Sequence, residues 1–320
     1  LALGQSDGSV ALVDARTLRG LSEFEVAPNG PVRGMAYVPR SEQLVVGGDD
    51  GFLALVDPRR ERIVKRLAGH SETVLTPSFR ADGRLMATAS DDPGDREAGV
   101  VRLWRLPSGV PAGRPLRYPA VGGISLSPDG RWLAVTRPPE GGVEIFDLAK
   151  GRQRGSLLGA KTVWDLVRFT PDGRYLVGGS YKGWARLWTV EEPGPGNLGE
   201  EWHPASRRFT GHAGRVEGVS ISADGRTLAT GSTDGTIRLW DLDTQQPLGT
   251  PLPGLPGRYL LPQFTPDRAY LFALTDAGRA YRWDVRPRSW ARHACAVAGR
   301  RLTPTEWESA LPERDYNPAC

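Results

Sequence analysis

Polar and apolar residues alternate along this chain in short stretches separated by turn signals, most clearly between positions 216 and 241. The alternation covers three segments, 216–221, 228–232 and 237–241. A period of two predicts β-strands with two packed faces, and Asp234-Gly235 is a strong signal for a tight hairpin between the last two. A weaker fourth strand is expected to begin at Leu248.

The same pattern recurs along most of the chain. Alignment on the pair Trp240-Asp241 shows seven units, spaced 42 to 52 residues apart, that end near residues 14, 57, 105, 147, 189, 241 and 284. A period in the low forties is typical of the four-stranded blades of β-propellers. We therefore predict an all-β, seven-bladed propeller over residues 1–288, with an incomplete first blade, and a short helical C-terminal tail over residues 289–320.

The best-preserved unit opens with Gly211-His212 and closes with Trp240-Asp241, and it resembles the repeats of the WD-repeat family. In that family a histidine, a serine or threonine, an aspartate and a tryptophan form a buried structural tetrad, which supplies the polar partners that a buried indole and imidazole need. The resemblance implies a tetrad at His212, Ser232, Asp234 and Trp240. A second set is expected at His70, Ser90, Asp92 and Trp104, and the set decays in the other units.

The two ends of the ring have a feature of their own. The first unit starts at its second strand, and the last unit has three strands that end near Val285. A propeller closes by combining the first and last stretches of its chain in one blade. We therefore expect residues upstream of Leu1 to supply an inner strand for the first blade and an outer strand for the seventh, so that Leu1 is not a native start.

Composition narrows the possible partners and the compartment. The chain is 39% hydrophobic with a net charge of +4, and only four of its 41 basic residues are lysine, which codon bias explains better than nucleic-acid binding does. No apolar run approaches the ~20 residues of a membrane span, and the start does not resemble a signal peptide. Cys295 and Cys320 lie outside the repeats, so we expect no disulfide in the ring, as suits a cytoplasmic protein.

Two glycine-rich stretches resemble nucleotide-binding motifs. Residues 194–199 match G-x-G-x-x-G, but two prolines break the stretch, and no strand and helix frame it as a dinucleotide site requires. Residues 155–162 have the wrong glycine spacing for a phosphate loop. The four histidines include no pair with metal-ligand spacing. We therefore expect no cofactor, no metal and no catalytic residue.

The tail has a helical period. Trp290, Ala294 and Val297 lie on one helix face, and Thr303-Pro304-Thr305-Glu306 is a capping box that predicts a short helix through Leu311. The basic residues at 286–301 favour a solvated helix face over a nucleic-acid site. Residues 289–320 resemble the tails of bacterial multidomain proteins in which WD repeats follow a STAND nucleotide-binding switch or a BTAD-type transcriptional regulator.

These features predict a non-catalytic protein-interaction scaffold, which forms a monomeric ring and is the C-terminal partner- or ligand-sensing module of a larger bacterial signalling or transcription-regulatory protein. The alternative is an enzymatic or small-ligand-binding propeller with a site in the axial channel. Converging carboxylates or histidines would favour catalysis, but the first positions of the inner strands hold a mixture of residues: Pro31, Thr73, Ala120, Val163, Arg215 and Arg258. We call the rim formed by the loops that precede the inner strands the top face. Its partner-binding side chains are expected to be exposed at Arg33, Leu75, Asp165, Tyr181, Glu217 and Leu260.

Overall fold

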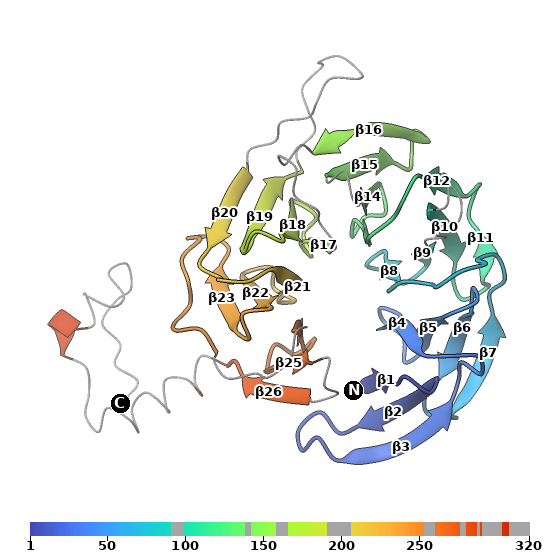
Figure 1. Cartoon of the computed structure of the whole chain (residues 1–320), viewed down its shortest axis with the longest axis horizontal. Helices are drawn as coiled ribbons and strands as arrows, with labels where there is room; N and C mark the ends of the chain where they lie inside the picture. The colour runs from blue at the N-terminus through green and yellow to red at the C-terminus, as the bar shows by residue number, and fades with distance from the viewer. Residues whose placement is uncertain are drawn as a thin grey trace.

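Seven antiparallel β-sheets stand in a ring around a central axis (Figure 1). This computed structural model describes residues 1–90, 99–137, 142–157, 166–190, 206–252, 260–275, 280–286, 289 and 303–306. Each sheet is made of strands that follow one another in the sequence, so each sheet is one blade. The seven-bladed, all-β propeller predicted from the repeat spacing is confirmed.

The blades are numbered in chain order, and their strands run outward from the axis. The first blade contains β1 (Ala2–Gly4), β2 (Ser9–Val13) and β3 (Gly20–Glu25). The second contains β4 (Val32–Tyr37), β5 (Leu44–Gly48), β6 (Leu53–Asp57) and β7 (Arg62–Arg66). The third contains β8 (Ser78–Phe79), β9 (Leu85–Ser90), β10 (Gly99–Arg105), β11 (Val110–Pro111) and β12 (Leu116–Tyr118).

The other four blades complete the ring. The fourth contains β13 (Ile124–Leu126), β14 (Trp132–Thr136), β15 (Val143–Asp147) and β16 (Arg152–Leu157). The fifth contains β17 (Val167–Phe169), β18 (Tyr175–Gly179), β19 (Trp184–Thr189) and β20 (Ser206–Thr210). The sixth contains β21 (Val216–Ile221), β22 (Thr227–Ser232) and β23 (Ile237–Asp241), and the seventh contains β24 (Leu261–Phe264), β25 (Tyr270–Leu274) and β26 (Ala280–Asp284).

A hydroxyl–carboxylate pair shapes the turn between the first two strands of several blades. Ser222 Oγ donates to Asp224 Oδ1 at 2.6 Å, and the same oxygen accepts the Arg226 amide at 3.2 Å. Gly225 takes the left-handed conformation, with φ 73°, that this tight turn requires. The pair recurs at 2.5 Å as Ser127–Asp129, Thr170–Asp172 and Thr265–Asp267. We call the side of the ring that carries these turns the turn face.

The hydrophobic core is divided among the spaces between neighbouring blades. Six clusters of buried side chains join consecutive blades, from the first–second pair to the sixth–seventh pair. Between the second and third blades, for example, Leu53 and Leu55 pack with Met86 and Trp104. Because both faces of a central strand touch a neighbouring blade, strands such as β5 are buried along their whole length.

The inner strands pair on one side only, which permits proline there. Pro262 lies on β24 opposite Ala273 of β25, as expected for an edge strand. The sixth and seventh blades approach each other closely at this level. A Cβ added at Gly231 would lie 2.1 Å from the Leu260 carbonyl oxygen, so a larger residue at position 231 would push the two blades apart.

Two outer strands differ from the regular pattern. The strand predicted from Leu248 is reduced to two isolated bridges, Ile237↔Leu252 and Trp240↔Pro247. Pro247 and Pro251 lack the amide hydrogens that a continuous ladder needs, which explains the interruption. In the third blade the outer strand is split into β11 and β12, and both pieces pair with β10.

The first and seventh blades lie beside each other (Figure 1). Both have three described strands; β1 pairs with β2 in the way that β5 pairs with β6, so the first blade begins at the strand that is second elsewhere, as predicted. The pKa of Asp267 in the seventh blade is lowered by hydrogen bonds from Thr265 and Ala269, and also by Arg16 of the first blade. The charge of Arg16 therefore acts on the seventh blade from the first.

The tail is described only at residue 289 and residues 303–306. Residues 304–306 are helical. The Glu306 carboxylate accepts the Thr303 amide at 2.8 Å, and the Glu306 amide donates to Thr303 Oγ1 at 3.3 Å, which are the reciprocal bonds of the predicted capping box. Trp290, Ala294, Val297, Leu311 and both cysteines lie outside the described residues. Within the described part of the chain, no helix has the length and apolar character needed to cross a membrane.

Candidate functional site

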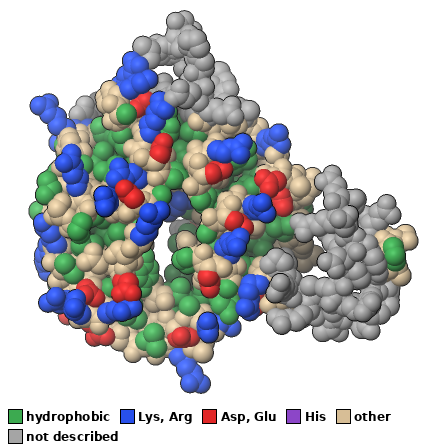
Figure 2. Space-filling model, turned by 180° about the vertical axis from the view of Figure 1, so that it is seen from behind, with side chains coloured by type: hydrophobic (Ala, Val, Ile, Leu, Met, Phe, Trp, Pro, Cys, Tyr) green, Lys and Arg blue, Asp and Glu red, His purple; other side chains and the backbone are tan. Residues whose placement is uncertain are grey.

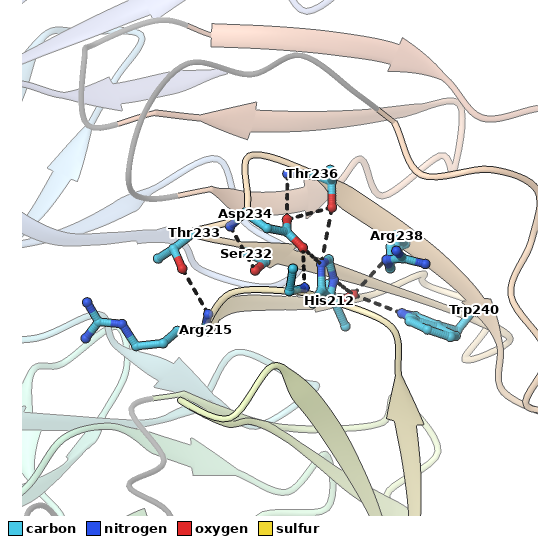
Figure 3. Close-up of polar contacts among 10 residues, drawn as sticks. His212, Arg215, Ser232, Thr233, Asp234, Thr236, Arg238 and Trp240 are labelled. Carbon is cyan, nitrogen blue, oxygen red and sulfur yellow. Dashed lines mark hydrogen bonds and ion pairs between the residues drawn. The ribbon is translucent and has the colours of Figure 1, made fainter.

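The sixth blade holds a buried network centred on His212 (Figure 3). His212 lies in the loop before β21, and its Nε2 is 2.8 Å from Thr230 Oγ1 on β22. Trp240 on β23 donates its Nε1 hydrogen to the same Thr230 oxygen at 2.9 Å. On the opposite edge of the imidazole, His212 Nδ1 is 3.0 Å from Asp234 Oδ2, in the turn between β22 and β23.

His212 contacts a hydroxyl on one side of its imidazole and a carboxylate on the other. Thr230 Oγ1 accepts the indole hydrogen, lies 2.8 Å from His212 Nε2 and lies 3.5 Å from the Arg238 carbonyl oxygen. The ionised Asp234 carboxylate can only accept, so it accepts the hydrogen of His212 Nδ1. Burial lowers the pKa of His212, whereas the hydrogen bond and the negative charge of Asp234 raise it. Every polar atom from the Trp240 indole to the Asp234 carboxylate therefore has a partner at hydrogen-bond distance.

Asp234 joins this network to the top face. Burial alone would raise its pKa, but hydrogen bonds from Thr236, Ala213 and His212 together lower the pKa to about 2. The carboxylate accepts the Ala213 amide at 2.9 Å, and Thr233 Oγ1 accepts the Arg215 amide at 2.9 Å. The turn between β22 and β23 thus holds the loop that precedes β21. The Arg215 side chain points away from the network (Figure 3).

Ser232 has a different place from the one implied by the family resemblance. Its Oγ accepts the Asp234 amide at 3.2 Å and so stabilises the turn, while the hydroxyl between the histidine and the tryptophan belongs to Thr230. Thr230 is completely buried. The sequence did carry a signal for it, because a threonine stands two residues before the serine in both units that have the histidine, as Thr88 and as Thr230.

The third blade repeats the network with one change. His70 Nε2 is 2.8 Å from Thr88 Oγ1, and Trp104 donates to that oxygen at 2.7 Å. His70 Nδ1 is 2.7 Å from Ser90 Oγ, so a hydroxyl takes the position that Asp234 has in the sixth blade. Burial, with a contribution from Arg102, lowers the pKa of His70 to about 4. The expected fourth member, Asp92, lies outside the described residues.

The top-face side chains predicted to bind a partner lie in different environments. Arg33 is exposed and pairs with Asp49 at 2.9 Å, and Asp49 also accepts a bond from Thr73 Oγ1 at 2.9 Å. The Arg215 guanidinium lies over the Tyr181 ring, 5.2 Å from its centroid, and 3.7 Å from the Glu217 carboxylate.

The expected exposure was wrong for several of these residues. Leu260 is completely buried in the cluster between the sixth and seventh blades, because the close approach of these blades covers it. The Glu217 side chain is only 9% exposed. Leu75 packs partly against the cluster between the third and fourth blades. Asp165 lies outside the described residues.

Other candidate chemistry is limited. Among the described residues, no group of three or more His, Cys, Asp or Glu side chains is placed to hold a metal ion. Residues 194–199, which match G-x-G-x-x-G, lie outside the described residues, and so do residues 158–162 of the second glycine-rich stretch. Residues 155–157 of that stretch belong to the outer strand β16.

Three segments of the chain match a known family of repeats. Residues 61–105, 151–189 and 204–241 match the family described as WD domain, G-beta repeat, and the first and third segments hold the two histidine networks. The chain is 30% identical over 214 residues to Pre-mRNA-processing factor 19 homolog 2 of Arabidopsis thaliana, with 65% of this chain and 37% of that protein covered.

Two further relatives have the same kind of similarity. The chain is 25% identical over 242 residues to guanine nucleotide-binding protein subunit beta of Oryza sativa subsp. japonica, with 73% of this chain and 59% of that protein covered. It is 23% identical over 231 residues to apoptotic protease-activating factor 1 of Rattus norvegicus, with 70% and 16% covered. The chain therefore spans less than two thirds of the length of each of these relatives.

Proposed function

Since this chain belongs to the WD-repeat family of β-propellers, we propose that it is a non-catalytic platform that binds a protein partner through its top face. WD-repeat propellers generally bind other proteins. The observation that carries the proposal is the way Asp234 and Thr233 hold the loop from which Arg215 extends. A rigid scaffold that presents loop side chains is suited to recognition.

The exposed side chains of the top face favour a partner with a polar binding surface. Arg33 and Arg215 have side chains that are 51% and 56% exposed, and each is oriented by a neighbouring carboxylate. The Tyr181 ring beneath Arg215 adds an amphipathic surface, and arginine and tyrosine are frequent in binding hot spots. A peptide segment with acidic and apolar residues would complement this surface.

The proposal extends to the context of the ring. The resemblance of residues 289–320 to the tails of bacterial STAND and BTAD-type proteins supports a sensing module at the C-terminal end of a cytoplasmic signalling or transcription-regulatory chain. The ring would act as a monomer, without a cofactor and without contact to nucleic acid or a membrane.

A paired charge-reversal experiment tests the top face. The top-face variant carries Arg33→Glu and Arg215→Glu. The control carries Arg174→Glu and Arg226→Glu, which reverse two exposed charges beside the turns of the turn face. Partners captured by the wild type from the source organism are identified by mass spectrometry and then tested as purified proteins. Binding should be lost with the top-face variant and kept by the control.

The outcome that contradicts the proposal is equally specific. Both variants must melt cooperatively like the wild type, since only folded proteins report on the surface. If the top-face variant then binds the purified partner as well as the control does, the partner site lies elsewhere on the ring.

A further inference from the structure

The residues at one equivalent position of the inner strands form a layer around the axis of the propeller. Its occupants all pair with the middle of the second strand of their blade, as Ser220 pairs with Ala229 and Arg168 with Val177. The described members of this layer are Ala36, Ser78, Ser125, Arg168, Ser220 and Gln263. Arg168 is the one charged side chain among them.

The serines of this layer connect consecutive blades. Ser78 Oγ accepts the Leu126 amide at 2.8 Å, Ser125 Oγ accepts the Phe169 amide at 3.0 Å, and Ser220 Oγ accepts the Phe264 amide at 3.1 Å. Each bond uses a lone pair of the hydroxyl oxygen and leaves the hydroxyl hydrogen free to donate. The serines therefore present donors around the axis. An arginine cannot accept an amide hydrogen, so Arg168 does not continue this pattern.

Arg168 has few partners for a cation in this position. Its Nη1 donates to the Val167 carbonyl at 3.0 Å and, more weakly, to the Ile124 carbonyl at 3.4 Å. Within the described part of the chain, no carboxylate forms an ion pair with it. Burial lowers the pKa of its guanidinium to about 10, so it stays charged at neutral pH. Arg168 is partly buried, and a partly desolvated cation without a counter-charge among the described residues is stabilised when an anion joins it.

A cavity of about 290 Å³ surrounds this guanidinium. Its lining comes from the inner strands and turns of the third to seventh blades and includes Arg168, Ser125, Ser220 and Gln263. Pro128 and Pro171 also line it, which places it toward the turn face. No Asp or Glu occurs among its described lining residues. Figure 2 shows the ring open at its axis, so the channel gives access from outside.

We infer that this cavity binds an oxyanion, a carboxylate or phosphate group, with Arg168 as the charged donor and the serine hydroxyls and the Gln263 amide as neutral donors. Guanidinium groups bind such oxygens through charge-assisted and often paired hydrogen bonds. The volume lies at the lower end of ligand pockets, about 300–1,000 Å³, and so fits a small metabolite or one acidic side chain rather than a large cofactor. The site lies away from the top face and does not depend on the partner proposed there.

Calorimetric titration of the 320-residue chain tests this site. The probes are inorganic phosphate, the dicarboxylate glutarate and a tetraglutamate peptide, each against sodium chloride of equal ionic strength. Saturable binding of phosphate or glutarate would identify a site for free small anions, whereas binding of the peptide alone would identify an acidic segment of a protein. If no probe binds with saturation, the inference is wrong.

The variants Arg168→Gln and Arg168→Lys identify the responsible group. Arg168→Gln should weaken binding by about tenfold or more, and Arg168→Lys should retain part of it, because lysine keeps the charge but not the planar donor pair. Arg174→Gln is the matched control, since it removes an exposed cation from the same blade outside the cavity. Equal loss in Arg174→Gln, or undiminished binding in Arg168→Gln, would contradict the assignment.

Thermal melts separate binding from a structural role. Without multivalent anions, Arg168→Gln should melt no lower than the wild type, because it removes a partly buried charge that has no counter-charge among the described residues. The best anion should raise the melting temperature of the wild type but not of this variant. A variant that melts lower in the absence of anions would instead assign Arg168 to the support of the Ile124 and Val167 carbonyls.

Discussion

The third and sixth blades contain the same histidine network with a different partner on Nδ1. In both, a buried threonine joins the imidazole to the tryptophan: Thr88 between His70 and Trp104, and Thr230 between His212 and Trp240. The Nδ1 partner is a serine in one blade and an aspartate in the other. The common part of the network is therefore the hydroxyl bridge, and the carboxylate is the variable part.

The Nδ1 partner also changes the electrostatics. Burial lowers the pKa of His70 to about 4, whereas Asp234 opposes the effect of burial on His212. The carboxylate has a second task, because it accepts the amide of the loop residue Ala213. The sixth blade thus connects its network to the top face by a charged group.

The largest expected effect is the loss of a tryptophan. Trp240→Ala should destabilise the protein by about 3–5 kcal/mol, because it opens a cavity and removes a donor from the bridge. Trp104→Ala should have a similar effect, since both indoles are almost fully buried. Chemical denaturation measures both. A Trp240→Ala protein that melts like the wild type would show that the network does not support the blade.

The bridging threonine should come next. Thr230→Val keeps the shape but leaves the Trp240 N–H and His212 Nε2 without a partner, at a cost of about 2–4 kcal/mol. Thr230→Ser restores the hydroxyl and should recover most of this loss. Ser232→Ala removes only the bond to the Asp234 amide and should cost about 1 kcal/mol or less. If Ser232→Ala were the more damaging change, the serine rather than the threonine would be the essential hydroxyl.

The pH dependence of stability tests the lowered pKa of His70. Folded His70 has a pKa of about 4, below its ordinary value of 6.5, so the unfolded chain binds a proton first as the pH falls. Stability is therefore present above about pH 6.5 and is lost toward pH 4, by at most about 3 kcal/mol. Urea denaturation across this range should show a flatter profile for His70→Gln. Parallel profiles for the variant and the wild type would contradict the shift.

A smaller effect than the loss of the bridging threonine should come from exchanging the variable partner. Asp234→Ser gives the sixth blade the arrangement of the third and should cost about 1–2 kcal/mol at neutral pH through the lost bonds to Ala213 and Thr236. The pKa of His212 should fall, because the group that raises it is gone. An NMR titration of the imidazole measures this directly. A His212 pKa that rose or stayed the same would mean that Asp234 does not control its ionisation.

Much of this architecture was predictable from local patterns. The alternation in 228–232 and 237–241, the Asp-Gly turns and the spacing of the Trp-Asp pairs are properties of neighbouring residues, and they predicted the blades and their number. His212, Asp234 and Trp240 were also predictable, because the family resemblance rests on short motifs. Thr230 was missed, although its repetition as Thr88 was visible, because nothing local distinguishes a bridging hydroxyl from an ordinary strand residue.

The sequence by itself determined the repeat, the turns and the residue types available to each blade, because these depend on the backbone preferences of adjacent residues. Only the tertiary structure decided which side chains meet between blades. Leu260 was expected at the surface and is buried, because a neighbouring blade covers it. Arg168 shares a layer with Ser125, which lies 43 residues before it in the sequence, and with Ser220, which lies 52 residues after it. Closure of the ring brings such distant positions to one axis, which no local pattern contains.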